Sequence, residues 1–355
     1  QLRNANKTGA TEIAPPPLWW TVKALPVWRT PCNLFTHANT ATEPSMHKGF
    51  STAIQSHPLG YHELKDKPAK PDLKAYYEQR YYQDSVRTHR PSYSPQELLY
   101  RENKCAQKRM LVENIWGPHQ PATPSLLDVG AGEGFVMDHF ARAGYAVHGM
   151  DFSSHGCHNH HPHLLDRLSC GDIEELVEQA VQSNAAHDLV ILDNVLEHLL
   201  EPGQLLVSVA QLLRPGGLLI IEVPNDFSMV QNHLLAEGRI PRPFWVASPD
   251  HISYFNADGL NALLDQHGFA LQTMLADFPI DLFLFNDKTN YVTDATAGKG
   301  CHQARIEIEN LMHARNAQAT LDMYAAMAKL GVGRQIMGVY QVRDNLQPPS
   351  TSRHL

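Results

Sequence analysis

The apolar positions of this chain follow two different patterns, and the second pattern begins near Ser125. From there, short apolar runs alternate with stretches of amphipathic, helical spacing, which is typical of helices covering a parallel sheet. The predicted strands are 125–129, 146–150, 168–170, 188–192, 218–223, 269–275 and 336–342. The predicted helices are 135–143, 173–182, 202–213 and 256–267, with a turn at 214–217. The pattern therefore predicts an α/β fold.

Before Ser125 the spacing of apolar residues is less regular. Residues 1–71 show no sustained period and contain the run Pro15–Pro17, so they are predicted to form a mostly irregular arm. Three large side chains within it, Trp19, Trp20 and Trp28, are still expected to bury against the body of the protein.

Helical spacing marks two further segments. Over 72–120 it includes a tyrosine-rich stretch, 76–82, and a second helix that Ser94 and Pro95 open. A polar helical pattern near 294–330 predicts an insertion before the last strand. The predicted divisions are an arm over 1–71, an N-terminal helical cap over 72–120, a core over 121–276, and an insertion with the final strand over 277–345.

Composition then limits the classes of molecule that the chain is expected to bind. The chain has 29 Lys and Arg against 37 Asp and Glu, a net charge of −8, so nucleic acid is not expected as a partner. Apolar runs stay well short of the roughly 18 residues that span a bilayer, so no membrane partner is expected. Five cysteines without a CxxC pair indicate reduced thiols and a cytoplasmic location.

A glycine-rich loop offers the first candidate chemistry. Gly130, Gly132 and Gly134 lie between a predicted strand and a predicted helix. Glycine allows a tight turn and a close approach to a ligand, and the helix N-terminus that follows favours an anionic group. The glycine spacing matches neither a P-loop nor a full dinucleotide fingerprint.

Two carboxylates end the next two predicted strands. Asp151 follows Gly132 by 19 residues, close to the spacing at which an acid accepts the ribose hydroxyls of a nucleotide. Asp172, in Gly171-Asp172-Ile173, can accept from an exocyclic amine such as adenine N6. Each carboxylate can instead cap the helix that follows it.

The ordered motifs of residues 72–343 resemble those of class I S-adenosylmethionine (SAM) dependent methyltransferases. They are Leu126–Gly134, Asp151, Gly171-Asp172, Asp188-Leu189-Val190, Val195-Leu196-Glu197-His198 and Leu213-Arg214-Pro215-Gly216-Gly217. The chain is most similar to a small-molecule branch in which Val-Leu-Glu-His precedes Pro-x-His-x-x-Tyr-Phe, here Pro249–Phe255.

The resemblance implies a Rossmann-like, seven-stranded and mostly parallel sheet whose last strand is antiparallel, with SAM as cofactor. It implies that the methionine end of SAM is held by Asp128, Gly130, Ala131, Gly132 and Gly134. It assigns the ribose to Asp151, the adenine to Asp172 and Ile173, and the surroundings of the sulfonium to Asn194 and Val195. The implied cofactor set also includes Phe152.

Two histidines are candidates for a general base, because ligands of open α/β sheets lie at the carboxyl ends of the strands. His198 closely follows the fourth core strand, and His251 lies in the loop after the fifth. His251 can instead brace its loop or cap a helix, and Glu197 with His198 can simply orient a helix start.

No metal is predicted. Some relatives bind a divalent cation through Glu-x-x-Glu-His, but this chain has Asn194 at the first position, and a neutral amide is a weaker ligand for a hard cation. The run His155–His163 is too dense for a standard zinc site, and we predict a solvated, histidine-rich turn there.

The sequence therefore predicts methyl transfer from SAM to oxygen, nitrogen or carbon of a small metabolite, with a sugar or secondary-metabolite precursor preferred and a homodimer possible. Arg239, Arg242, Phe244 and Trp245 can hold an anionic or planar acceptor, or simply pack against the caps. The alternatives are a catalytically silent SAM-binding protein and a nucleotide-sugar or dinucleotide enzyme on the same fold.

Overall fold

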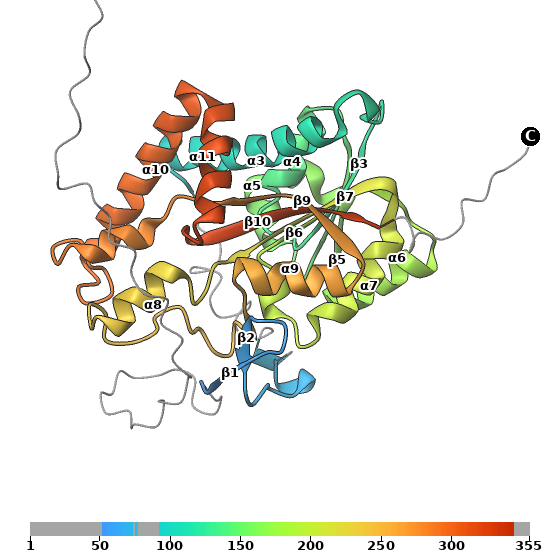
Figure 1. The fold of residues 1–355 in the computed structure, drawn as a ribbon. Helices are drawn as coiled ribbons and strands as arrows, with labels where there is room; N and C mark the ends of the chain where they lie inside the picture. The colour runs from blue at the N-terminus through green and yellow to red at the C-terminus, as the bar shows by residue number, and fades with distance from the viewer. Residues whose placement is uncertain (1–51, 74, 77–91, 344–355) are drawn as a thin grey trace, which may run out of the picture. The chain divides into compact units, whose positions relative to one another are not determined.

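The computed structural model describes residues 52–73, 75–76 and 92–343 of the chain (Figure 1). The predictions for the three tryptophans of the arm and for residues 77–82 lie outside the described residues. Within the described part, no helix is both long enough and apolar enough to cross a bilayer.

A seven-stranded sheet forms the centre, in the order β5-β4-β3-β6-β7-β10-β9. Its strands are β3 (Ser125–Val129), β4 (Ala146–Asp151), β5 (Leu168–Cys170), β6 (His187–Asp193), β7 (Leu213–Pro224), β9 (Phe269–Ala276) and β10 (Gln335–Val342). Strand β10 runs antiparallel to both of its neighbours, and the pairs from β5 to β7 are parallel. The predicted fold class, including the antiparallel last strand, is confirmed.

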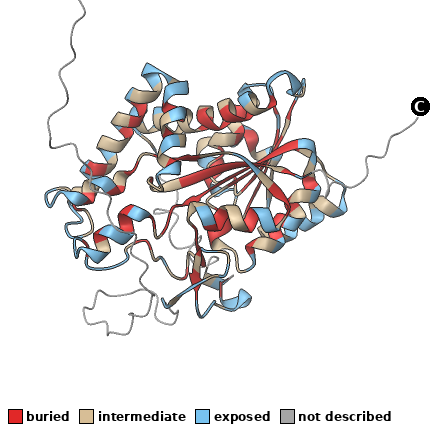
Figure 2. Ribbon diagram, in the orientation of Figure 1, coloured by how far each residue is buried: buried red, intermediate tan, exposed pale blue. Residues whose placement is uncertain are grey.

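Helices cover both faces of the sheet, so its central strands are mostly apolar (Figures 1 and 2). One face is covered by α6 (Ile173–Gln182), α7 (Pro202–Leu212) and α9 (Ala257–Gln266). The other face is covered by α3 (Pro95–Trp116), α4 (Phe135–Arg142), α5 (His155–His160) and α11 (Ala317–Lys329), and α10 (Ala297–Arg315) packs against α3 and α11. Polar groups consequently gather at the strand ends.

The turn predicted at 214–217 is wrong, because β7 already begins at Leu213. Leu213 pairs with His187 of β6, and the register then shifts before Leu218 pairs with Leu189. The residues between them bulge, with Gly216 in the left-handed region at φ 79°. Pairing with β6 extends the strand through a sequence that by itself favours a turn.

A small antiparallel sheet was not predicted, and it corrects the irregular interpretation of part of the arm. It joins β1 (Ile54–Ser56) and β2 (His62–Leu64) to β8 (Ser253–Tyr254), whose residues pair with β2 across 190 to 192 positions of the sequence. Trp245, 1% exposed, packs beneath it in a third apolar cluster. The structure also adds α8 (Met229–Ala236), which begins with a capping box on Ser228 in a stretch that shows no clear period.

The helical insertion is tied to α3 by a buried ion cluster. Glu309, 2% exposed, lies 2.7 Å from Lys104 Nζ and 3.1 Å from Arg305 Nε, and it accepts the Tyr324 hydroxyl at 2.7 Å. Burial by itself would raise the pKa of Glu309, but Lys104 and Arg305 lower it below its usual value. The polar pattern that predicted an insertion thus marks an ionic contact with α3.

Removing one partner from such a cluster leaves uncompensated buried charge. We expect Glu309→Ala to lower the free energy of unfolding by about 3–5 kcal/mol in urea titrations. Glu307→Ala, on the exposed side of the same helix, controls for helix propensity and is expected to change it by less than about 0.5 kcal/mol. Equal effects of the two substitutions would show that the cluster does not hold the insertion.

Candidate active site

The glycine loop closes tightly against the carboxyl ends of β3, β4 and β6. Gly130 has φ 83°, and a Cβ there would lie 2.4 Å from Cγ2 of Val195, so no other residue fits without a shift. The amides of Gly130 and Ala131 donate to the Met150 carbonyl at 2.8 and 3.0 Å. Glycine at these positions therefore allows a tight turn that leads into α4.

Asp151 secures the same loop from the end of β4. It is 7% exposed; Oδ2 accepts the Gly132 amide at 2.8 Å, and Oδ1 accepts the Ser153 amide at 3.0 Å. Each carboxylate oxygen has a second acceptor site, so the predicted contact with a ribose is compatible with these bonds. Phe152 follows directly and is half-buried.

Asp172 caps α6, since its Oδ1 accepts the Glu175 amide at 3.2 Å. The capping role that the sequence left open is thus the contact seen here, and the half-buried Ile173 begins the helix. The remaining carboxylate oxygen of Asp172 lies at the same sheet edge as Asp151.

Asn194 does not join the histidines. Its backbone is left-handed at φ 54°, its Nδ2 donates to Asp193 Oδ1 at 2.7 Å, and its Oδ1 accepts Gln335 Nε2 at 3.0 Å. Val195 is buried against Gly130. The side chain at the first position of Asn-x-x-Glu-His is therefore engaged with β6 and β10.

His198 and His251, the two candidate bases, lie next to each other. Their ring centroids are 5.0 Å apart at 83°, and His198 Nδ1 is bonded to the Asp250 carbonyl at 2.6 Å. The two loops are joined where the Ile252 amide donates to the Glu197 carbonyl at 2.8 Å.

Glu197 completes this histidine cluster. Its side chain is 1% exposed, and neither carboxylate oxygen has a hydrogen-bond partner among the described residues. Burial raises its pKa well above the usual value, and the nearby carboxylate of Asp226 adds to the effect. One ligand atom each from Glu197, His198 and His251 lies within 4.8 Å of the others, an arrangement that can hold a cation.

Reasoning from the sequence did not identify a second charged group, which lies on the sheet face that α3 covers. Lys108 of α3 is buried, and its Nζ lies 3.1 Å from Asp193 Oδ2 and 2.5 Å from Glu222 Oε2. Asp128 shares this sheet edge; it is 2% exposed, and burial together with Asp193 raises its pKa to about 8. The one available signal is that Asp128, Asp193 and Glu222 fall at or next to the ends of apolar runs.

The histidine-rich run is not a solvated turn throughout, which corrects that prediction. It forms α5 and a following 3₁₀ turn (Pro162–Arg167). The side chains of His160 and His161 are only 10% and 12% exposed, and a ring nitrogen of His161 bonds the Glu133 carbonyl at 2.7 Å. The run therefore buttresses the glycine loop.

The four basic and aromatic residues that precede His251, from Arg239 to Trp245, have different surroundings. Trp245 is buried, with its ring at 81–82° to those of Phe227 and Phe244, which is a packing role. Arg242 is exposed, and Arg239 donates to the Phe285 carbonyl at 3.3 Å.

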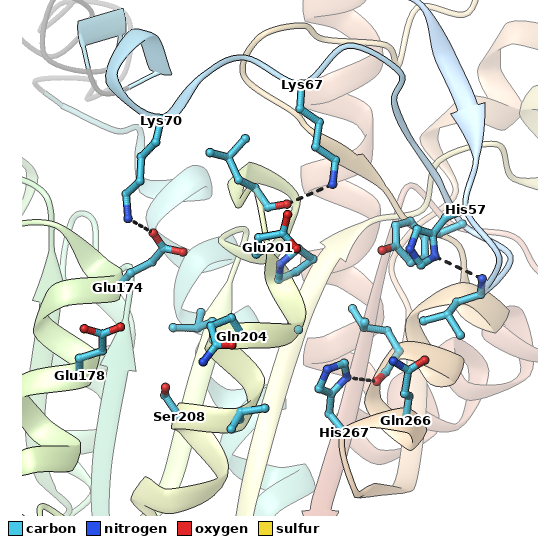
Figure 3. Close-up of a pocket in the computed structure, with 18 of the residues that line it drawn as sticks. His57, Lys67, Lys70, Glu174, Glu178, Glu201, Gln204, Ser208, Gln266 and His267 are labelled. Carbon is cyan, nitrogen blue, oxygen red and sulfur yellow. Dashed lines mark hydrogen bonds and ion pairs between the residues drawn. The ribbon is translucent and has the colours of Figure 1, made fainter.

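A cavity of about 580 Å³ lies away from these residues, between α6, α7, α9 and the segment 57–70 (Figure 3). Lys70 pairs with Glu174 at 2.6 Å across it, and Lys67 donates to the Leu200 carbonyl at 3.1 Å. None of the predicted site residues lines this cavity.

Comparison with known proteins assigns the family. Residues 99–274, from within α3 to within β9, match the family model described as "Methyltransferase domain". The chain belongs to the class I SAM-dependent methyltransferases. The chain is 33% identical over 103 residues to a ubiquinone biosynthesis O-methyltransferase from Caulobacter vibrioides, covering 28% of this chain and 41% of that protein.

Two further proteins to which the chain is similar are also named SAM-dependent methyltransferases. A probable SAM-dependent methyltransferase from Mycolicibacterium smegmatis is 26% identical over 190 residues, or 53% of this chain and 65% of that protein. The crystal structure of a SAM-dependent methyltransferase from Archaeoglobus fulgidus aligns with a TM-score of 0.42 and 16% identity, over 67% of this chain and 93% of that one. The chain spans about two fifths of the length of the Caulobacter vibrioides relative.

The raised pKa of Asp128 gives a stability prediction. The folded protein keeps this proton up to about pH 8, whereas the unfolded chain releases it near pH 4, so this group's contribution to stability falls as the pH rises between those values. We expect Asp128→Asn to remove up to about 1.4 kcal/mol per pH unit of that slope in urea titrations from pH 5 to 8. Asp166→Asn, at an exposed position, is the control, and a wild-type slope in Asp128→Asn would contradict the assignment.

Proposed function

We propose that this protein transfers the methyl group of SAM to a small-molecule acceptor. The observation that carries the proposal is the meeting of the glycine loop, Asp151 and the histidine pair at the carboxyl edge of one sheet, where open α/β folds bind ligands. Several of the curated relatives, from bacteria and from Homo sapiens, are named O-methyltransferases of ubiquinone biosynthesis, which favours oxygen as the acceptor atom. A sugar or secondary-metabolite precursor remains our preferred acceptor class.

The residues divide the work as follows. Asp151 and Phe152 hold the ribose, Asp172 and Ile173 hold the adenine, and the glycine loop with Asp128 holds the methionine end. SAM, when bound, supplies an electrophilic methyl group on its sulfonium. Asn194 and Val195, fixed by Gln335 and Gly130, shape the wall beside it. Most of the rate enhancement is expected from orientation, which can contribute roughly 7–11 kcal/mol.

The histidine pair supplies the base for a hydroxyl or amine acceptor. His198 donates from Nδ1 to the Asp250 carbonyl, which fixes the tautomer with Nε2 as the acceptor nitrogen. A general base of this kind contributes typically about 100- to 10,000-fold. His251, packed edge-on against His198, lies in reach of the same proton.

A divalent cation is the second candidate for this step. Glu197, His198 and His251 fit a cation, because two imidazoles and an otherwise unpartnered buried carboxylate are the ligands of a transition metal or zinc. A cation held there would polarise the acceptor oxygen and lower its pKa. Asn194 takes no part, since its side chain bonds Asp193 and Gln335.

The cellular setting remains a prediction. The four cysteines that the structure describes, Cys105, Cys157, Cys170 and Cys301, are free thiols, which supports a reducing, cytoplasmic compartment. A homodimer and the exclusion of nucleic acid also remain predictions.

Asp151 is the first position to test. We expect Asp151→Ala to weaken binding of S-adenosylhomocysteine by more than about 100-fold in calorimetric titrations, because it removes charged acceptors from the ribose and releases the Gly132 amide. Asp166→Ala is the matched surface control. Wild-type affinity in Asp151→Ala would overturn the cofactor site, and competition by NAD would favour the dinucleotide alternative.

Turnover separates the two catalytic candidates from a silent SAM-binding protein. We measure S-adenosylhomocysteine formed from SAM with a pool of small hydroxylated metabolites, before and after removal of bound metal with EDTA. For a histidine base, EDTA has no effect, while His198→Ala and His251→Ala lower kcat by about 100-fold or more and leave S-adenosylhomocysteine affinity unchanged.

For a metal-assisted reaction, EDTA abolishes turnover and Zn²⁺ or Mn²⁺ restores it. Metal analysis then finds one ion per wild-type chain and none in Glu197→Gln. If the wild-type protein binds SAM yet forms no product under either condition, the silent alternative stands.

A further inference from the structure

The cavity between α6, α7, α9 and the segment 57–70 lies outside the methyl-transfer site. Its volume of about 580 Å³ falls within the range of small-molecule sites in proteins. In Figure 3 the segment that carries Lys67 and Lys70 crosses over the helices that form the opposite walls. None of the residues proposed to hold SAM or to act on the acceptor lines the cavity, so a ligand bound there would be a second ligand.

Both lysines of the cavity already have acidic partners. Lys70 Nζ lies 2.6 Å from Glu174 Oε2. Lys67 Nζ lies 2.8 Å from Glu63 Oε2 and also donates to the Leu200 carbonyl at 3.1 Å. Neither ammonium group is therefore left to neutralise an anionic ligand.

Three further carboxylates of the cavity have no such partner. Glu175, Glu178 and Glu201 line it, and their side chains make no ion pair or hydrogen bond among the described residues. Glu175 and Glu201 lie at helix starts, where the helix dipole favours an acid. Glu178 lies in the second turn of α6, four residues after Glu174, a like-charge spacing that destabilises a helix. The cavity thus carries negative charge that a cationic ligand would neutralise.

Tyr61 gives an independent indication of a ligand. It is only 3% exposed and lines the cavity, yet its hydroxyl has no hydrogen-bond partner in the described part of the chain. Burial raises the pKa of this hydroxyl, and the nearby charges of Glu63 and Glu201 raise it further, so it keeps its proton. Buried polar groups are nearly always hydrogen-bonded, and a polar group of a ligand in the cavity would supply the missing partner.

A single metal ion does not match this distribution of charge. Among the residues that the structure describes, the one group of three metal-ligating side chains within 4.8 Å of each other is the histidine cluster, and none of its members lines the cavity. The carboxylates of the cavity are therefore spread along its walls. Ammonium groups spaced along a flexible chain can reach separate carboxylates, which one small ion cannot.

We propose that this cavity is a binding site for an organic polycation, an aliphatic chain that carries two or more ammonium groups. Glu178 and Glu201 pair with separate ammonium groups, and the Tyr61 hydroxyl accepts one of their N–H bonds. Leu59 and Leu263, which also line the cavity, contact the methylene groups between them. The inference does not depend on the proposed function, because the two sites share no residue.

Spermidine is a suitable probe, since it has three amino groups on an aliphatic chain. In calorimetric titrations at low ionic strength, we expect Glu178→Gln to weaken spermidine binding by about three- to tenfold, because the substitution removes a charged acceptor. Tyr61→Phe removes the hydroxyl alone and is expected to weaken binding by about two- to fivefold. Glu237→Gln, at an exposed position at the end of α8, is the matched control, with an expected change of less than about twofold.

A substitution that fills the cavity tests its location. Ser208 of α7 is half-buried and lines the cavity, so Ser208→Arg places a cation among the unpaired carboxylates. We expect this variant to bind spermidine more than about tenfold more weakly than the wild-type protein, and to keep the wild-type midpoint in urea titrations and the wild-type affinity for S-adenosylhomocysteine.

Four results would overturn the inference. The first is a wild-type protein that does not bind spermidine. The second is an equal loss of affinity in Glu178→Gln and Glu237→Gln, which would show attraction by the net charge of −8 alone. The third is wild-type affinity for spermidine in Ser208→Arg. The fourth is displacement of spermidine by an equal concentration of Mg²⁺, which would show a site for small ions.

Discussion

One buried ammonium group, that of Lys108, joins the parts of this protein on which its site depends. It pairs with carboxylates at the ends of β6 and β7, and so ties α3 to the carboxyl edge of the sheet. Burying a charge is costly unless its partners are close and well placed, so the two strands and α3 must keep their relative positions. One turn earlier on the same helix, Lys104 makes the corresponding contact to the insertion through Glu309.

The positions of His198 and His251 depend on a different set of contacts. His251 and His198 come from loops after two neighbouring strands. Those loops are joined by the backbone bond from Ile252 to Glu197 and by the bond between the His198 ring and the Asp250 carbonyl. The segment around His251 is in turn paired through β8 with β2, near the start of the described chain. The positions of the two histidines are therefore set by contacts between loops.

Much of the core was predictable, because the helices and strands have strong periodic patterns. Strands β3 and β5 and helix α6 have the bounds that the apolar runs predict, and the other core strands differ by few residues apart from β7. The failures have physical causes. The early start of β7 comes from pairing with β6, and the strands β1, β2 and β8 are too short to show a pattern without their distant partners. His160 and His161 looked like a solvated turn because burial against the glycine loop leaves no local signal.

The sequence by itself determined the α/β class, the glycine loop and the acids that end β4 and precede α6, since each is a local pattern of residue type and spacing. Tertiary structure decided what those residues contact. It turned Asn194 toward Gln335, gathered Glu197, His198 and His251, and set Lys108 among Asp128, Asp193 and Glu222. The reason is that strand order, which sequence spacing does not encode, brings ends far apart in the chain to one edge, and burial there makes every charge depend on its neighbours.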